Sequence, residues 1–149
     1  MSRLIPTTVL HFTHVSHLPT IVGRGLQCDT SARQGSLSVE VGNASIKEAR
    51  RARRVPVDPG GFVADYVPFY FAPRSPMMYA IEMGNVPTYA DGCGDLVYLV
   101  SDVQRLRALG LRVLGTDRNA VLGHAEFTED DARLTDIVDW DLMRARMWN

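Results

Sequence analysis

Residues 45–56 read Ser-Ile-Lys-Glu-Ala-Arg-Arg-Ala-Arg-Arg-Val-Pro, and residues 65–79 read Asp-Tyr-Val-Pro-Phe-Tyr-Phe-Ala-Pro-Arg-Ser-Pro-Met-Met-Tyr. The first run is typical of an arginine-rich helix, and the second is typical of an aromatic strand punctuated by proline. A guanidinium group can donate two parallel hydrogen bonds to a phosphate, and aromatic faces stack on bases and nicotinamide rings. Together the two runs indicate a nucleotide or nucleic-acid ligand held at one place.

The arginine-rich helix is expected to begin at Ser45, because Glu48 three residues later completes a capping box. It is expected to run to about Arg54, where a proline and a Pro-Gly-Gly turn follow. In such a helix Arg50, Arg53 and Arg54 share one face. A solvated basic face and an anion-binding face both fit this pattern.

The aromatic run is expected to form a strand over residues 66–71. Because Pro68 cannot donate a hydrogen bond to a neighbouring strand, this strand is expected at a sheet edge or interrupted. Alternation of the side chains lets one face pack in the core while the other lines a site. Arg74, at the end of the run, is a further candidate contact for an anion.

Outward from this stretch, strands and short helices are mixed without the regular strand–helix–strand rhythm of a parallel sheet. This favours an α+β fold in one domain, residues 1–149. The patterns predict strands at 8–15, 95–100 and 111–114, and a strand or helix at 77–83. Helices are predicted at 16–22, capped by Ser16, and at 102–109, capped by Asp102 and ended by Gly110, with a final helix from Asp136 or Asp139. Loops are predicted at 27–43 and 116–125.

Composition limits the classes of function. The formal net charge of the 149 residues is −1, so contact with a polyanion must come from a local basic patch. The two cysteines, Cys28 and Cys93, make neither a metal set nor a disulfide framework. The first residues lack the apolar core of a signal peptide, and no apolar run approaches the roughly 20 residues of a membrane span. We therefore expect a cytoplasmic protein.

Two groups of polar residues are candidates for chemistry. His11 and His14 point to opposite faces of their predicted strand, which argues against a shared metal ion. Asp117 and His124 form an acid–base pair only if the fold brings them together. The chain has no phosphate-binding glycine loop, zinc pattern or nucleophile elbow, so the residues alone name no reaction.

Several blocks, in order along the chain, resemble the DarT toxins, which are NAD-dependent ADP-ribosyltransferases acting on single-stranded DNA. The blocks are residues 11–18, 46–56, 65–79, 116–125 and 139–148, of which 65–79 is the most specific. The resemblance implies an ADP-ribosyltransferase-like fold with a mixed β core and short flanking helices. It also implies NAD as co-substrate without a metal, a base of single-stranded DNA (thymine) as acceptor, a cognate DarG-like macrodomain antitoxin as partner, and no membrane.

The resemblance also assigns roles to individual residues. Arg50 takes the part of the arginine that engages NAD and is needed for transfer, residues 34–53 fold over the dinucleotide, and the segment from Asp117 onward approaches DNA. The implied NAD-binding residues are His11, Phe12, Thr13, Thr20, Cys28 and Arg50, and the implied DNA-binding residues are Arg74, Asp117, Arg118, Asn119 and His124.

In the family a catalytic glutamate follows the Asp-Trp-Asp helix on a later strand. We therefore expect that glutamate, and the C-terminal strands, beyond Asn149, in a chain that is truncated relative to the family. Glu126 has a similar neighbourhood but lies too early, within the DNA-reading segment. Three hypotheses follow: an ADP-ribosyltransferase, an inactive module that binds NAD or single-stranded DNA, and a nucleic-acid-binding protein that uses no NAD.

Overall fold

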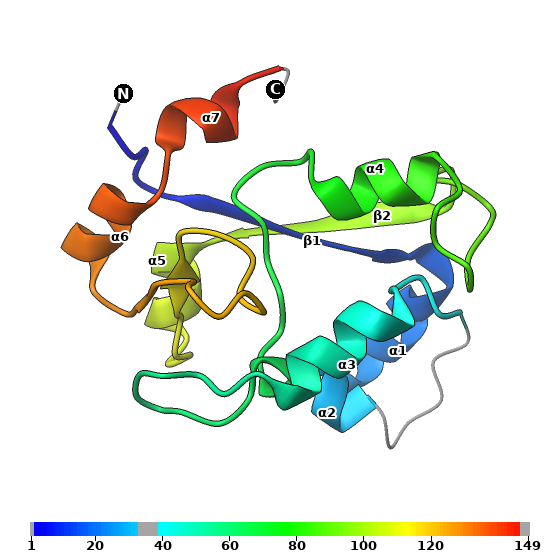
Figure 1. The fold of residues 1–149 in the computed structure, drawn as a ribbon, viewed down its shortest axis with the longest axis horizontal. Helices are drawn as coiled ribbons and strands as arrows, with labels where there is room; N and C mark the ends of the chain where they lie inside the picture. The colour runs from blue at the N-terminus through cyan, green and yellow to red at the C-terminus, as the bar shows by residue number, and fades with distance from the viewer. Residues whose placement is uncertain (1, 33–38, 147–149) are drawn as a thin grey trace.

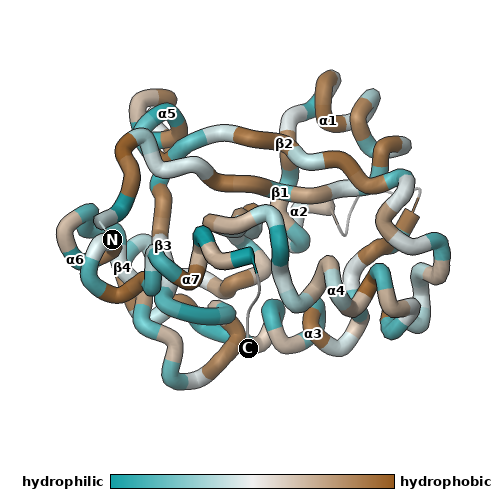
Figure 2. Tube along the Cα trace, turned by 90° about the horizontal axis from the view of Figure 1, so that it is seen from above, coloured by the Kyte–Doolittle hydropathy of each residue, from teal (hydrophilic) through white to brown (hydrophobic). Residues whose placement is uncertain are grey.

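Two antiparallel strands run through the middle of the molecule (Figure 1). β1 (Thr8–His14) pairs with β2 (Leu96–Asp102), so that Leu10 lies opposite Val100 and Phe12 opposite Tyr98. Figure 2 shows hydrophobic and polar stretches along both strands. Val9 and Thr13 of β1 are buried, whereas the residues of β2 are all at least partly exposed. The computed structural model describes residues 2–32 and 39–146. It confirms the α+β class and the strands predicted at 8–15 and 95–100.

Helices flank the strand pair. In Figure 1 α1, α2 and α3 lie below it and α4 above it, while α6 and α7 lie near the N-terminus. No helix within the described ranges is long and apolar enough to cross a membrane. The remaining elements are η1 (Val15–His17), α1 (Leu18–Arg24), α2 (Asp29–Ala32), α3 (Ala44–Ala52), η2 (Val63–Asp65), α4 (Pro76–Glu82), α5 (Val103–Ala108), β3 (Gly115–Thr116), β4 (Phe127–Thr128), α6 (Asp131–Ile137) and α7 (Trp140–Arg144).

Buried hydrophobic residues gather in separate clusters. α3 contains no buried residue, but the chain enters a cluster just before it, at Val41, and another just after it, at Val55. α3 is therefore held mainly at its ends and by its polar side chains. The clusters described are the first (Val41, Ile81, Val86, Tyr89), the second (Val55, Val63, Ala125, Phe127) and the third (Leu134, Val138, Trp140).

The arginine-rich helix differs from its prediction at both ends. Asn43, not Ser45, caps it, since the Asn43 side chain accepts a hydrogen bond from the backbone N–H of Ser45. The helix ends at Ala52, because Arg53 is extended and Arg54 pairs with Phe62 in an antiparallel bridge. The predicted face shared by Arg50, Arg53 and Arg54 is therefore wrong.

The predicted strands at 66–71 and 111–114 are also wrong. The aromatic run forms one antiparallel bridge, Leu10 with Tyr70, at the edge of β1, and after Leu114 only the two residues of β3 pair with β4. Backbone pairing across the molecule, which local patterns do not encode, decides both segments.

Cap residues explain the other helices. Ser75 accepts from the N–H of Met78 and Pro76 begins α4, so residues 77–82 are helical and Met83 follows the helix end. Asp102 caps α5 and Gly110, at a φ of 81°, follows its end, as predicted. Asp139 caps α7, whereas α6, capped by Asp130, was not predicted. Two predictions at the other end of the chain fail: Ser16 does not cap α1, which begins at Leu18 and has no side-chain cap, and the loop at 27–43 contains α2.

Candidate functional site

The guanidinium of Arg50 is held by three acceptors from two neighbouring elements. Its Nε donates to Oδ2 of Asp29 at 2.7 Å, and its Nη2 donates to the backbone carbonyls of Val63 at 3.3 Å and Tyr66 at 3.1 Å. Asp29 begins α2, and the two carbonyls belong to η2 and the residue after it. The Arg50 side chain is only 14% exposed, so α2 and η2 together fix where it points.

His11 lies beside this ion pair. The Pro68 carbonyl is 2.7 Å from Nδ1 of His11, so Nδ1 carries the proton and donates, and Nε2 is left as an acceptor. Burial lowers the pKa of His11; the Pro68 carbonyl and the Asp29 carboxylate raise it, and the Arg50 cation lowers it. His11 and Arg50 also contact the same short segment, at the carbonyls of Pro68 and Tyr66, so this segment joins β1 to the Arg50–Asp29 pair.

Tyr70 adds an aromatic ring that the sequence analysis left unassigned. Burial raises the pKa of its hydroxyl, and the Arg50 cation opposes this shift. Its ring stacks on Phe12, at 5.9 Å between centroids and 16° between planes. Phe12 also meets Tyr98 edge-on and packs against the first core cluster. The ring of Phe12 therefore supports Tyr70 from within the core, on the strand face opposite His11.

Thr13 and His17 form a buried polar pair. The hydroxyl of Thr13 is 2.9 Å from Nδ1 of His17, and the backbone N–H of Val39 donates to Nε2 of the same ring. Since Nε2 accepts, Nδ1 carries the proton and donates to Thr13. His17 thus joins β1 to the chain that leads into α3. No group of three or more His, Cys, Asp or Glu side chains suited to a metal occurs within residues 2–32 and 39–146.

The other predicted NAD-binding residues, Cys28 and Thr20, differ in how they relate to the Arg50–Asp29 pair. Cys28 directly precedes Asp29, is half-buried, and its thiol donates to the Ser31 hydroxyl. Thr20 is exposed on α1. The structure therefore places Cys28 next to the pair, whereas no described hydrogen bond joins Thr20 to it.

The predicted acid–base pair does not form among the described residues. Asp117 accepts from Nε of Arg118 at 2.6 Å and from the backbone N–H of Glu126 at 2.8 Å, and His124 is exposed. Burial raises the pKa of Asp117, but these two donors together lower it by more. The pKa therefore lies below the ordinary value, and the carboxyl stays ionised. Glu126 is itself bound by both nitrogens of the Arg133 fork, so both carboxylates of this loop are engaged.

The loop between β3 and β4 is tied to the end of α3. Nη2 of Arg53 donates to the Gly123 carbonyl at 3.3 Å, and its guanidinium lies 5.7 Å from the centre of the Phe127 ring. Asn119 is exposed in the same loop and closes a turn to the N–H of Val121. Arg74 is exposed before α4. The structure therefore joins the loop to the arginine-rich segment, whereas no described hydrogen bond or ion pair joins Arg74 to either.

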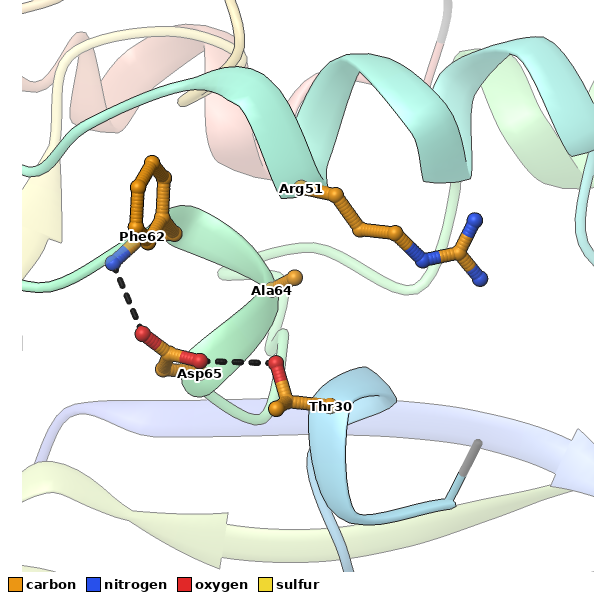
Figure 3. Close-up of a pocket in the computed structure, with 5 residues that line it drawn as sticks. All are labelled: Thr30, Arg51, Phe62, Ala64 and Asp65. Atoms are coloured by element: carbon orange, nitrogen blue, oxygen red, sulfur yellow. Dashed lines mark hydrogen bonds between the residues drawn. The ribbon is translucent and has the colours of Figure 1, made fainter. Parts of the chain in front are cut away.

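A small open pocket of about 210 Å³ lies between α2, α3 and η2 (Figure 3). Within it the hydroxyl of Thr30 donates to Asp65 at 2.7 Å, and the other oxygen of Asp65 accepts from the N–H of Phe62 at 2.8 Å. Arg51 extends along the opposite side of the pocket and donates to Glu48. Its lining residues are Thr30, Arg51, Phe62, Ala64 and Asp65.

Comparison with known families gives one match. Residues 10–149 match the family model described as "ssDNA thymidine ADP-ribosyltransferase, DarT". A DNA ADP-ribosyl transferase of Thermus sp. (strain 2.9) is 38% identical over 146 residues, which cover 96% of this chain and 67% of the relative. Its counterpart in Mycobacterium tuberculosis is 34% identical over 145 residues, covering 95% of this chain and 61% of the relative.

Solved structures agree with the sequence matches. Thermus sp. 2.9 DarT in complex with ADP-ribosylated ssDNA superposes with a TM-score of 0.91 at 38% identity, over 99% of this chain and 70% of that one. The same protein in complex with NAD+ superposes with a TM-score of 0.84 at 35% identity, over 99% and 69%. The chain thus spans about two thirds of the length of these relatives.

Proposed function

The chain belongs to the DarT family, and from that premise we propose that its Arg50 site binds NAD and that the protein transfers ADP-ribose to a base of single-stranded DNA. One observation carries the proposal. Arg50 is fixed by Asp29 and the Tyr66 carbonyl, close in the chain to the Pro68 carbonyl that His11 of β1 binds, in a chain that superposes on a relative solved with NAD+ and on the same relative solved with ADP-ribosylated ssDNA.

The donors and acceptors at the site suit a dinucleotide. Nε and Nη2 of Arg50 are occupied within the protein, and Nη1 has no hydrogen-bond partner among the described residues. Nη1 is thus available to an anionic phosphate, for which a guanidinium is a strong donor. Nε2 of His11 is left to accept, because Nδ1 donates to Pro68, and the ring of Tyr70 is held against Phe12. Cleavage of the nicotinamide–ribose bond builds positive charge on the ribose, and a fixed arginine keeps the substrate oriented while this happens.

The finer parts of the proposal come from the family. The family description names thymidine, so we propose its base, thymine, as the acceptor. The loop of Asp117, Arg118 and Asn119 is the segment proposed to approach DNA, with His124 and Arg74 as further contacts. We also propose that the protein acts as a toxin whose partner is a DarG-like macrodomain antitoxin. The catalytic glutamate remains a prediction for a position beyond Asn149.

A second candidate function is binding of NAD or single-stranded DNA without transfer. It is favoured by the surroundings of Arg50. Among the described residues, the carboxylate that contacts Arg50 is that of Asp29, and it is already engaged in an ion pair with Arg50. Glu126 is likewise engaged, by Arg133. Neither carboxylate is free to take a proton from an accepting base without losing its cation.

Labelled NAD separates these functions. The protein is incubated with labelled NAD and, in separate reactions, with single-stranded DNA, RNA and protein acceptors. Label on single-stranded DNA supports transfer, and label on protein alone contradicts the DNA acceptor. Saturable NAD binding without label on any acceptor supports the second function. Oligonucleotides that lack thymine test the base.

A further inference from the structure

We propose that Asp29 is a positioning residue for NAD binding: it aims the guanidinium of Arg50 so that its Nη1 edge faces the ligand. This inference rests on the proposed function and adds a residue to it. Asp29 lies next to Cys28 in the chain, outside the residues to which the family resemblance gives a role.

The first argument is the geometry of the Arg50 fork. A free arginine side chain has many rotamers, and ordering it when a ligand binds weakens binding. In this structure Asp29 takes Nε, and the carbonyls of Val63 and Tyr66 take Nη2. A guanidinium is planar, so acceptors at Nε and Nη2 fix both the position and the plane of Nη1. Of the three acceptors Asp29 alone is charged, and it makes the shortest contact.

The second argument is the way Asp29 is held. α2 has four residues, too few to be stable alone. Its next residue, Thr30, donates to Asp65, and Asp65 also binds the N–H of Phe62 at the start of η2 (Figure 3). The hydrogen bond between Thr30 and Asp65 therefore ties α2 to η2. It also sets the spacing between the Asp29 carboxylate and the two carbonyls, so the three acceptors of Arg50 form one group.

Charge alone predicts the opposite effect of removing Asp29. Its carboxylate neutralises Arg50, and the pyrophosphate of NAD is anionic. If Asp29 were only a counter-charge, the variant Asp29→Ala would leave a free cation and bind NAD more tightly, most clearly at low salt. If Asp29 aims Arg50, the same variant binds NAD more weakly, because the fork must then be ordered by the ligand.

Calorimetric titration of NAD decides between these effects. We expect NAD to bind about 10-fold more weakly to Asp29→Ala than to the unaltered protein. The control is Glu48→Gln, which removes one negative charge from α3 at the exposed Arg51 pair and is expected to change affinity less than about 3-fold. Unchanged or tighter binding by Asp29→Ala overturns the inference alone. Failure of the unaltered protein to bind NAD overturns the proposed function and the inference with it.

A double-mutant cycle excludes a purely structural effect. In the Arg50→Lys background the planar fork is absent, so Asp29→Ala is expected to weaken NAD binding less than about 2-fold further. An equal loss in both backgrounds contradicts the inference, because Asp29 would then act independently of Arg50. Asp29→Asn keeps an acceptor for Nε, so its NAD affinity is expected to lie between those of the unaltered protein and Asp29→Ala. It provides a folded variant if Asp29→Ala does not unfold cooperatively.

Discussion

Arg50 and Arg51 are adjacent on α3 but meet different surroundings. Arg50 turns toward α2 and η2 and is 14% exposed, whereas Arg51 pairs with Glu48, whose side chain is 75% exposed. Neighbouring residues of a helix point about 100° apart, so they cannot serve the same ligand. The sequence analysis chose Arg50 through the family resemblance, because the run of arginines itself does not distinguish its members.

We therefore expect Arg50→Ala to weaken NAD binding about 100-fold and to abolish transfer. Arg51→Ala removes the same charge from the next position and is expected to change the affinity less than about 3-fold. Calorimetric titration of NAD into both variants measures the difference. Equal losses would mean that general positive charge, and not one oriented guanidinium, attracts the ligand.

His17 predicts how stability depends on pH. Burial lowers the pKa of its ring, and neighbouring His14 lowers it further; the pKa of His11 is also lowered, mainly by burial. Below the ordinary pKa of about 6.5 the unfolded chain binds more protons than the folded one. The stability from these neutral rings is therefore complete above about pH 6.5 and is lost as the pH falls through the folded-state pKa values.

Urea unfolding at pH 7.5 and 5.5 tests this. We expect the free energy of unfolding to be lower at pH 5.5 than at pH 7.5. In His17→Gln this decrease is expected to be smaller, and His11 accounts for part of what remains. His124→Gln, at an exposed site, serves as the control. A fall that is unchanged in His17→Gln would rule out this residue as its source.

At the scale of elements, prediction succeeded where the signal was local. β1 alternates and β2 is a continuous apolar and aromatic run over residues 96–100, Asp102 and Gly110 bound α5, and Asp139 begins α7. It failed where a distant partner decides the backbone. The backbone of the aromatic run pairs with β1 at a single bridge, Tyr70 with Leu10, and β3 exists because of β4, 11 to 13 residues later. The site depends on such distant pairings too, since Asp29 and Val63 reach Arg50 through the fold.

The short strand β3 is packed directly against α6. A Cβ atom added at Gly115 would overlap the side chain of Leu134, which is 1% exposed. Gly115→Ala is therefore expected to destabilise the protein by about 1–3 kcal/mol. Gly123→Ala has no atom within 4 Å of the added Cβ and is the matched control. Chemical denaturation of both variants measures the difference, and equal stabilities would show that β3 and α6 separate without cost.

At the scale of the whole molecule, the core is divided among small clusters that the sequence patterns did not reveal. Phe71 of the aromatic run packs edge-on against Trp140 of α7, at 5.0 Å between ring centroids, so a residue predicted in a strand instead covers a helix near the end of the chain. The residues that face one another across these clusters are far apart in sequence. Local periodicity therefore identified which residues are apolar but not which of them meet.

The position of α3 between the first and second clusters has a consequence for motion. With no buried residue of its own, α3 can open locally while both clusters stay folded, and such openings set the rate at which backbone amides exchange with deuterium. We expect the amides of α3 to exchange faster than those of β1, and NAD to slow α3 selectively by bridging Arg50 to β1. Mass spectrometry of exchange with and without NAD measures both rates; an α3 as protected as β1 in the free protein would contradict this. α3, which carries Arg50, is then also the element whose local opening NAD binding suppresses.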